Sequence, residues 1–108
     1  MKKPRPPLER VVQRQCVAYL KAKGWSVWQT SQGHKHPTGA KGLRITPGIP
    51  DLYCLHPTHG ALWVECKREG GKLSPAQEQF RDLHVARNDS VPGWMVVWSL
   101  DDLRRTIP

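Results

Sequence analysis

The stretch that decides the fold is ITPGIPDLYCLHPTHGALWVECKREGG, residues 45–71. Two runs rich in apolar and aromatic residues, 49–56 and 61–68, flank the short segment PTHG, and this pattern predicts two antiparallel strands joined by a tight turn. One carboxylate, Asp51, follows a Gly-x-Pro turn, and a second, Glu65, lies in the next run in the triplet Glu-Cys-Lys. The whole chain has only 9 acidic residues, so the position of these two in one hairpin is a specific feature.

The two acids are predicted to face each other across the hairpin. Side chains alternate between the faces of a strand, so Glu65 and Lys67 project to one face and Cys66 to the other. A hairpin centred on Thr58 places Asp51 directly across from Glu65, with side-chain roots about 5 Å apart. This register requires a turn of odd length, because a four-residue turn would put the acids on opposite faces unless a bulge restored the alignment.

Two carboxylates at that spacing repel each other unless a positive charge lies between them. Mg²⁺ or Mn²⁺ would remove the repulsion, with one oxygen from each acid, one from a backbone carbonyl such as that of Cys66, and waters for the rest. Such an ion can polarise a phosphodiester and activate a bound water, while Lys67 stabilises charge on the attacked phosphate. In the alternative interpretation, Asp51 ends a turn and Glu65 and Lys67 form an exposed polar pair, since Glu-x-Lys triplets are frequent by chance. The turn, the hairpin spacing and the basic background together favour the metal site.

The N-terminal part predicts a helix, a strand and a long loop. Residues 8–23 have helical periodicity, and Glu9 and Gln13 continue the apolar stripe into the first turn. Glu9 therefore either faces the acidic pair or is a solvated glutamate favoured by the helix dipole. The composition of residues 25–30 is typical of a short strand, and residues 31–48 have the composition of a loop that is functional or disordered.

The C-terminal part predicts two helices around one more strand. Ser74 and Gln77 have the spacing of a capping box at a helix start. The apolar run 93–98 is typical of a strand covered on both faces, and Ser99 with Asp102 predicts the cap of a last short helix.

Composition limits the class of protein. A chain of 108 residues suits one compact domain, and its formal charge of +8 suggests a polyanionic partner, most commonly nucleic acid. No apolar run of membrane-spanning length and no signal-type segment occurs in the sequence, so we expect a soluble intracellular, cytoplasmic protein without a membrane partner. The 3 cysteines are expected to be reduced core residues. Core packing is also predicted for at least four of the 5 tryptophans, with base stacking as the alternative.

The motifs closely resemble those of the VRR-NUC domain, the virus-type replication-repair nuclease branch of the PD-(D/E)XK superfamily. The matching segments are Gly-Ile-Pro-Asp at 48–51, Glu-Cys-Lys at 65–67 and Leu-Ser-Pro-Ala-Gln at 73–77, behind a helix that carries Glu9 and Gln13. The resemblance extends over most of the chain, from about residue 8 to about residue 100. It implies one α/β domain over residues 1–108, of which residues 1–7 are a basic flexible leader, with a restriction-endonuclease-like α-β-β-β-α-β core. Its mixed sheet would be flanked by helices, and a short C-terminal helix would follow.

The resemblance also implies an activity and assigns roles. It implies a metal-dependent DNA endonuclease that uses Mg²⁺, with Mn²⁺ able to substitute, and no organic cofactor. By resemblance, Asp51, Glu65 and the Cys66 carbonyl hold metal and Lys67 is catalytic together with the two acids. Glu9 would supply a supporting metal or water contact, with Gln13 and Gln77 as active-site support.

Stand-alone members of this type, including those of phages, resemble Holliday-junction resolvases that act as homodimers on four-way DNA. The size of the chain agrees with pairing, because one active site cuts one strand and two symmetric nicks need two copies. Phosphate contacts would come from basic residues that cluster in the long loop and after the hairpin: Lys35, Lys41, Arg44, Arg68 and Lys72.

Other functions remain open at this point. One is a non-catalytic DNA-binding module that uses the basic loop 31–48. Another is a nuclease of the same fold that prefers flaps or single strands. A zinc protein is disfavoured, because the available ligands lack Cys-x-x-Cys or paired-His spacing: His34, His36, His59, Cys54 and Cys66.

Overall fold

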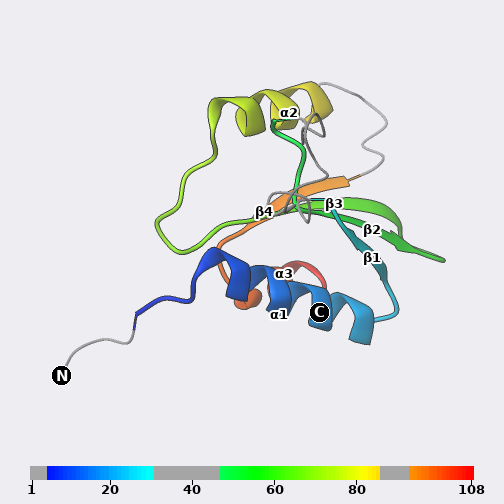
Figure 1. The fold of residues 1–108 in the computed structure, drawn as a ribbon. Helices are drawn as coiled ribbons and strands as arrows, with labels where there is room; N and C mark the ends of the chain where they lie inside the picture. The colour runs from blue at the N-terminus through cyan, green and yellow to red at the C-terminus, as the bar shows by residue number, and fades with distance from the viewer. Residues whose placement is uncertain (1–4, 31–46, 86–92) are drawn as a thin grey trace, which may run out of the picture.

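The computed structural model describes residues 5–30, 47–85 and 93–108. The elements follow in the order α1 (Glu9–Ala22), β1 (Ser26–Gln29), β2 (Leu52–His56), β3 (Gly60–Cys66), α2 (Pro75–Val85), β4 (Gly93–Val97) and α3 (Leu100–Thr106) (Figure 1). This order confirms the predicted α-β-β-β-α-β arrangement with a short C-terminal helix. Across the described ranges, none of the helices combines the length and the apolar character needed to cross a membrane.

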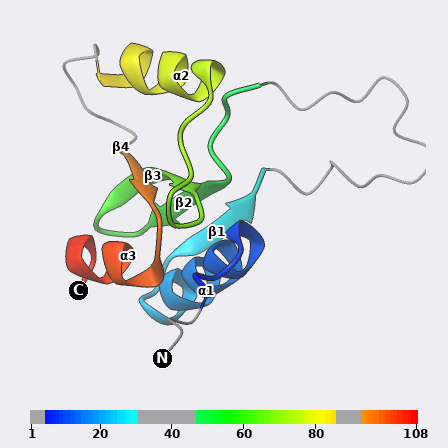
Figure 2. The ribbon, with the colours of Figure 1, turned by 90° about the vertical axis from the view of Figure 1, so that its left-hand side faces the viewer.

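The strands form one mixed sheet in the order β1-β2-β3-β4. The β1–β2 and β2–β3 pairs are antiparallel, whereas β4 runs parallel to β3. A parallel pair needs a crossover connection, and the connection from β3 to β4 contains α2. Figures 1 and 2 show α2 on one side of the sheet and α1 with α3 on the other. The two faces of the sheet therefore have different covers.

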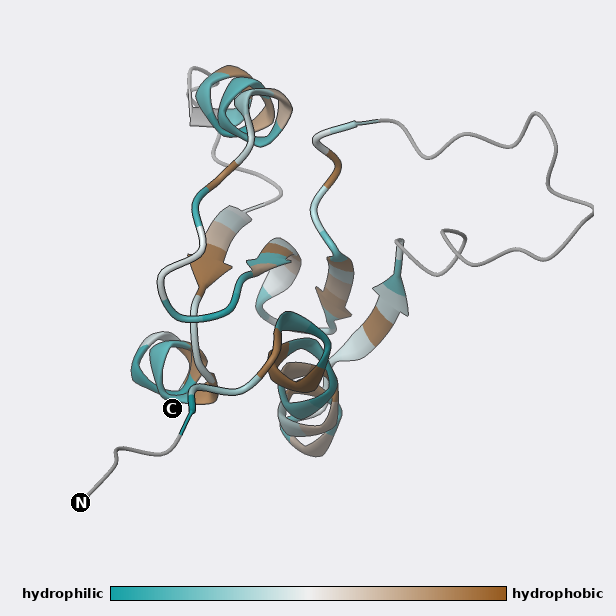
Figure 3. Ribbon diagram, turned by 60° about the vertical axis from the view of Figure 1, so that its left-hand side comes forward, coloured by the Kyte–Doolittle hydropathy of each residue, from teal (hydrophilic) through white to brown (hydrophobic). Residues whose placement is uncertain are grey.

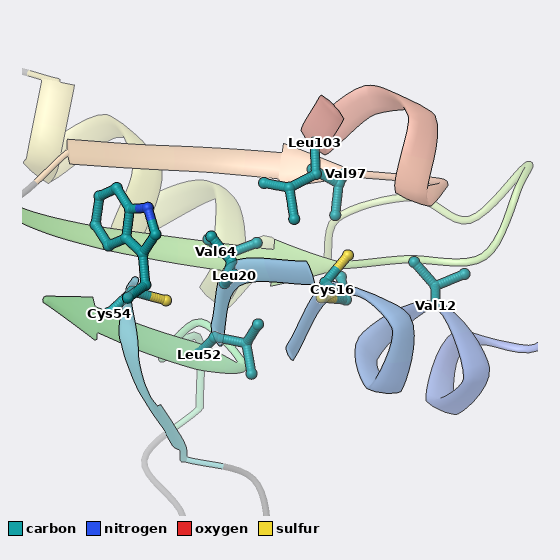
Figure 4. Close-up of a cluster of buried hydrophobic side chains, with 10 residues drawn as sticks. Val12, Cys16, Leu20, Leu52, Cys54, Val64, Val97 and Leu103 are labelled. Carbon is teal, nitrogen blue, oxygen red and sulfur yellow. The ribbon is translucent and has the colours of Figure 1, made fainter. Parts of the chain in front are cut away.

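The hydrophobic core lies between the sheet and the pair α1 and α3. The helical stripe of α1 buries Val12, Cys16 and Leu20, and the sheet meets them with alternate residues of its strands (Figure 4). The remaining core members are Trp25, Leu52, Cys54, Val64, Cys66, Val97 and Leu103. All three cysteines are free and buried, as predicted. Figure 3 shows hydrophobic colour along the strands and a largely hydrophilic α2.

The hairpin has the register predicted from its turn. Leu52 pairs with Val64, and His56 pairs with Gly60, which leaves a turn of three residues, 57–59. The His56 ring stabilises this turn, because its Nδ1 accepts hydrogen bonds from the backbone N–H groups of Thr58 at 3.1 Å and His59 at 3.3 Å. The odd length of the turn places Asp51 and Glu65 at opposite positions of the hairpin, as predicted.

The prediction that at least four tryptophans pack in the core is wrong. Trp25 is buried at 7% exposure, whereas Trp63 and Trp94 are half-buried and Trp28 and Trp98 are exposed. The cause is the asymmetry of the sheet, since the face toward α2 receives a thinner cover than the face toward α1 and α3. Strand β4 is likewise half-buried along most of its length, so the prediction of full cover on both faces is also wrong.

The two predicted helix caps differ. At α2 the capping box is confirmed, because the backbone N–H of Ser74 donates to Gln77 Oε1 at 2.8 Å and the N–H of Gln77 donates to Ser74 Oγ at 3.2 Å. At α3 the side chain of Ser99 makes no capping hydrogen bond. Asp102 Oδ2 instead accepts the backbone N–H of Trp98 at 2.8 Å, so this carboxylate satisfies the amide that precedes the helix.

Candidate active site

Asp51 is held in place from both sides of its strand. The N–H of Thr30 donates to the Asp51 carbonyl oxygen at 2.8 Å, and Thr30 Oγ1 donates to the carbonyl oxygen of Pro50. On the other side, the N–H of Cys66 donates to Asp51 Oδ2 at 2.9 Å. Thr30 therefore fixes the backbone at Asp51, and the Cys66 amide fixes the orientation of the carboxylate.

The turn that delivers Asp51 is packed against the start of α2. Gly48 has a φ of +91°, which favours glycine, and a Cβ at this position would collide with the backbone carbonyl of Ala76. Pro50 is fully buried just before the carboxylate. The Gly-x-Pro-Asp motif thus combines a left-handed turn, a close approach to α2 and a fixed entry into β2.

Glu65 is a buried acid directly beside Asp51. It is 2% exposed and stands at the penultimate position of β3. Burial, a hydrogen bond with the Asp51 side chain and the charge of Asp51 together raise the pKa of Glu65 to about 9. The raised pKa favours the protonated form of Glu65, and its side-chain hydrogen bond with Asp51 agrees with the predicted closeness of the two acids.

Lys67 and Glu9 complete the charged cluster. The N–H of Lys67 donates to the Val97 carbonyl at 2.8 Å, so the strand continues far enough to place Lys67 on the face of Glu65. The positive charge of Lys67 opposes the rise in the pKa of Glu65. Glu9 in the first turn of α1 has a raised pKa, chiefly from burial; the Lys67 charge lowers it and the Asp51 charge raises it. The α1 stripe therefore directs Glu9 toward the acidic pair.

The two predicted supporting glutamines have structural contacts. Gln13 Nε2 donates to Gln29 Oε1 at 3.1 Å, which joins α1 to the end of β1. The backbone and side chain of Gln77 form the capping box of α2. Gln77 follows Ala76, whose carbonyl packs on the turn before Asp51, so its helix start borders the Asp51 turn.

The chemistry of the acidic pair fits a divalent cation. In the part of the chain that the structure describes, no three His, Cys, Asp or Glu side chains form a ready metal cluster. Two adjacent carboxyl groups nevertheless present the oxygen ligands that Mg²⁺ prefers, and such an ion usually keeps several waters. A cation at this position would also offset the Asp51 charge, which, after burial and the hydrogen bond with Asp51, raises the pKa of Glu65. The predicted ligands Asp51 and Glu65 are suited to this role, with Glu9 close enough to interact electrostatically.

The predicted basic contacts divide into two groups. Arg68 and Lys72 are exposed in the segment between β3 and α2, directly after the candidate site. The Trp98 indole N–H donates to the carbonyl of Gly71 in this segment at 2.7 Å, which ties it to the end of β4. Lys35, Lys41 and Arg44 lie outside the described residues, as does most of the predicted loop 31–48.

Thiol chemistry does not suit this site. Cys54 and Cys66 are fully buried in the core, on the opposite sheet face from the acidic pair. Burial raises the pKa of Cys54 to about 12, and a hydrogen bond with Cys16 together with burial raises the pKa of Cys66. Protonated thiols in a core are poor metal ligands and poor nucleophiles.

Thr30 and Gln29 are site residues that the sequence did not indicate. Thr30 binds the backbone on both sides of the Pro50–Asp51 peptide, and Gln29 contacts Gln13. Their roles depend on how β1 pairs with β2, where Gln29 pairs with Leu52. The long segment between these strands gives no local signal for that register.

The comparisons with known proteins agree with the fold. A solved structure described as a VRR_NUC domain is similar to this chain, with a TM-score of 0.66, 23% sequence identity and 92% of each chain covered. No protein-family model matches the sequence, and no curated protein matches it. The structural similarity confirms the predicted VRR-NUC-type fold.

Proposed function

We propose that the protein is a metal-dependent endodeoxyribonuclease that hydrolyses phosphodiester bonds, as a homodimer on branched, four-way DNA. The observation that carries the proposal is the buried Glu65 carboxyl group held against Asp51, with Lys67 on the same face. Burial of the Glu65 carboxyl group against the half-buried Asp51 is costly to the fold, and perturbed acids of this kind are typical of functional sites. The VRR-NUC motifs, the name of the similar structure and the charge of +8 support DNA cleavage as that function.

The residues of the chain have separate tasks in this mechanism. Asp51, Glu65 and the Cys66 carbonyl would hold Mg²⁺ or Mn²⁺, with the Glu65 carboxyl group in its ionised form. When bound, such an ion would supply Lewis-acid chemistry at the phosphodiester and at a water. Lys67 places its ammonium group beside the attacked phosphate and offsets charge in the transition state. Glu9 supports the position of a water beside the acidic pair, and Arg68 and Lys72 bind flanking phosphates.

The experiment that tests this proposal compares labelled linear duplex, single strand, flap and four-way junction, each with Mg²⁺ and with EDTA. Wild type is expected to cut in Mg²⁺ and not in EDTA, and Asp51→Ala and Lys67→Ala to lose about 100-fold or more of the rate. Matched controls are Asp101→Ala on α3 and Lys23→Ala after α1, which are exposed and outside the cluster. Equal cutting by wild type and both site variants would refute the site.

Two further results separate this function from its alternatives. Salt-sensitive DNA binding without cleavage in any metal would make the protein a binding module. Preference for the four-way junction, with paired nicks and a dimer mass by light scattering, would support the homodimer on branched DNA. Preference for flaps or single strands, or a monomer mass, would contradict that part while leaving the nuclease in place.

A further inference from the structure

A row of aromatic rings crosses the sheet beside the acidic pair. Trp28 of β1 pairs with Tyr53 of β2, and Tyr53 pairs with Trp63 of β3. The ring centroids are 6.1 Å apart for Trp28 and Tyr53, and 4.7 Å apart for Tyr53 and Trp63. Phe80 of α2 meets Trp63 edge-on at 5.5 Å. We call Trp28, Tyr53 and Trp63 the aromatic row.

The aromatic row lies next to the acidic pair on the same face. Asp51 is two residues before Tyr53, and Glu65 is two residues after Trp63, so strand alternation puts acids and rings on one side. Two residues of a strand span about 6.6–6.8 Å, which is about two base steps of a stacked DNA strand. A DNA strand that places one phosphate at Asp51 and Glu65 would therefore have its neighbouring bases within reach of the aromatic row.

The outer end of the row is uncovered. Trp28 is 52% exposed, while Trp63 is half-buried beneath Phe80. Trp28 adds nothing to the core, which lies on the other sheet face. A large exposed aromatic side chain beside a cluster of charged residues is typical of a recognition surface.

We propose that the aromatic row is a stacking surface for unpaired nucleobases of the DNA strand that is cut. This inference rests on the proposed nuclease function and specifies its substrate, which is a strand unpaired next to the scissile phosphate. Aromatic rings on a sheet stack with bases of any sequence, provided that the bases are free of their duplex partners. The charge of +8 complements the phosphates of the same strand, and the row is continuous with the acids that would act on it.

The proposal predicts a preference among branched substrates. Base stacking in a duplex hides the base faces, and freeing them costs least where pairing is already broken. A four-way junction or duplex with a few unpaired nucleotides at the branch is therefore expected to bind better than its fully paired counterpart.

The test measures binding of fluorescein-labelled oligo-dT and of a duplex of equal length in EDTA, where cleavage does not interfere. Trp28→Ala is expected to weaken oligo-dT binding about fivefold to a hundredfold and duplex binding less than twofold. Trp28→Phe keeps a ring and is expected to bind oligo-dT nearly as wild type does. The control is Leu55→Ala, because Leu55 is a 38% exposed apolar residue on the same face of β2, further from the acids.

A second measurement covers the case in which Trp28→Ala fails to fold. Oligo-dT is expected to quench the tryptophan emission of wild type, and Trp28→Phe is expected to lose part of that quenching because its ring does not contribute. Full quenching in Trp28→Phe would overturn the proposal. So would unchanged oligo-dT affinity in a folded Trp28→Ala, or equal losses for oligo-dT and duplex, because the row would then be packing between strands only.

The outcome is separable from that of the nuclease assay. Mg²⁺-dependent cleavage by wild type with no effect of Trp28→Ala on oligo-dT binding would reject the stacking surface and keep the nuclease. Selective loss of oligo-dT binding in Trp28→Ala, together with no cleavage by wild type, would keep the stacking surface and reject the nuclease.

Discussion

The two faces of the sheet differ in what they bury, although the same strands supply both. Toward α1 and α3, Leu52, Cys54 and Val64 are fully buried. Toward α2, the neighbouring residues Tyr53 and Trp63 are half-buried, and α2 itself has no buried residue among those whose side chains are described. One face is thus a core, and the other carries the acids and the aromatic row. The difference shows that a sheet with a strong cover on one face and a thin cover on the other leaves the second face for chemistry.

The largest expected difference is in the free energy of unfolding of two variants on opposite faces of β2. Leu52→Ala removes a fully buried side chain and is expected to lower the free energy of unfolding by about 2–5 kcal/mol. Leu55→Ala, on the other face of β2, is expected to cost less than about 1 kcal/mol. Urea denaturation of both variants measures the difference. Equal losses would mean that the second face is also a core.

The acidic pair is expected to make stability depend on pH and on metal. The folded pKa of Glu65, about 9, lies above its ordinary value of 4.5, so the folded state keeps a proton that the unfolded chain releases. Without metal, the contribution of Glu65 to stability is therefore fully present below about pH 4.5 and is lost as the pH rises through about 9. Glu9 contributes in the same direction.

Divalent metal should reverse that loss. Mg²⁺ at 100 times its dissociation constant is expected to add about 2.7 kcal/mol at pH 8, because it binds only the folded pair. Thermal unfolding from pH 4 to 9 in EDTA and in Mg²⁺ measures both effects. A flat profile in EDTA, or an equal Mg²⁺ effect in Glu65→Gln, would contradict the metal site.

A smaller loss of stability is expected from a substitution at Gly48, in the turn that packs against the start of α2. Gly48→Ala would force a strained φ and a collision with the Ala76 backbone, which costs about 1–3 kcal/mol. Because this turn positions Asp51, the variant should also cut DNA more slowly even at temperatures where it stays folded. The control is Gly70→Ala, at a similar φ of +83° but with open space around the position. The same cleavage rate in both variants would separate the turn from the site.

Local sequence signals predicted much of this molecule. The apolar runs on either side of PTHG predicted the hairpin, and an odd turn length was the condition for its register. The three-residue turn meets that condition, and strand alternation then places Asp51, Glu65 and Lys67 on one face. The helical stripe through Cys16 and Leu20 likewise directs Glu9 to the site.

The features that were missed depend on contacts between distant segments. Thr30 reaches Asp51 only because β1 pairs with β2 across a long insertion, which sequence patterns do not specify. The exposure of Trp28 depends on how far the cover on the α2 side extends, whereas its position in an apolar run suggested core packing. At α3, Asp102 rather than Ser99 accepts the neighbouring amide, because the side-chain geometry selects between two plausible caps.

The most direct test of the central claim is the rate of Mg²⁺-dependent DNA cleavage by Glu65→Gln. This change keeps the size of the buried side chain and removes the charge that the metal needs, so the variant should be at least as stable as wild type in EDTA at pH 8. The account predicts that its cleavage rate falls about 100-fold or more. The exposed control Glu78→Gln on α2 should cut as wild type does. Cleavage by a folded Glu65→Gln at the wild-type rate would contradict the claim that the Asp51–Glu65 pair is the active site.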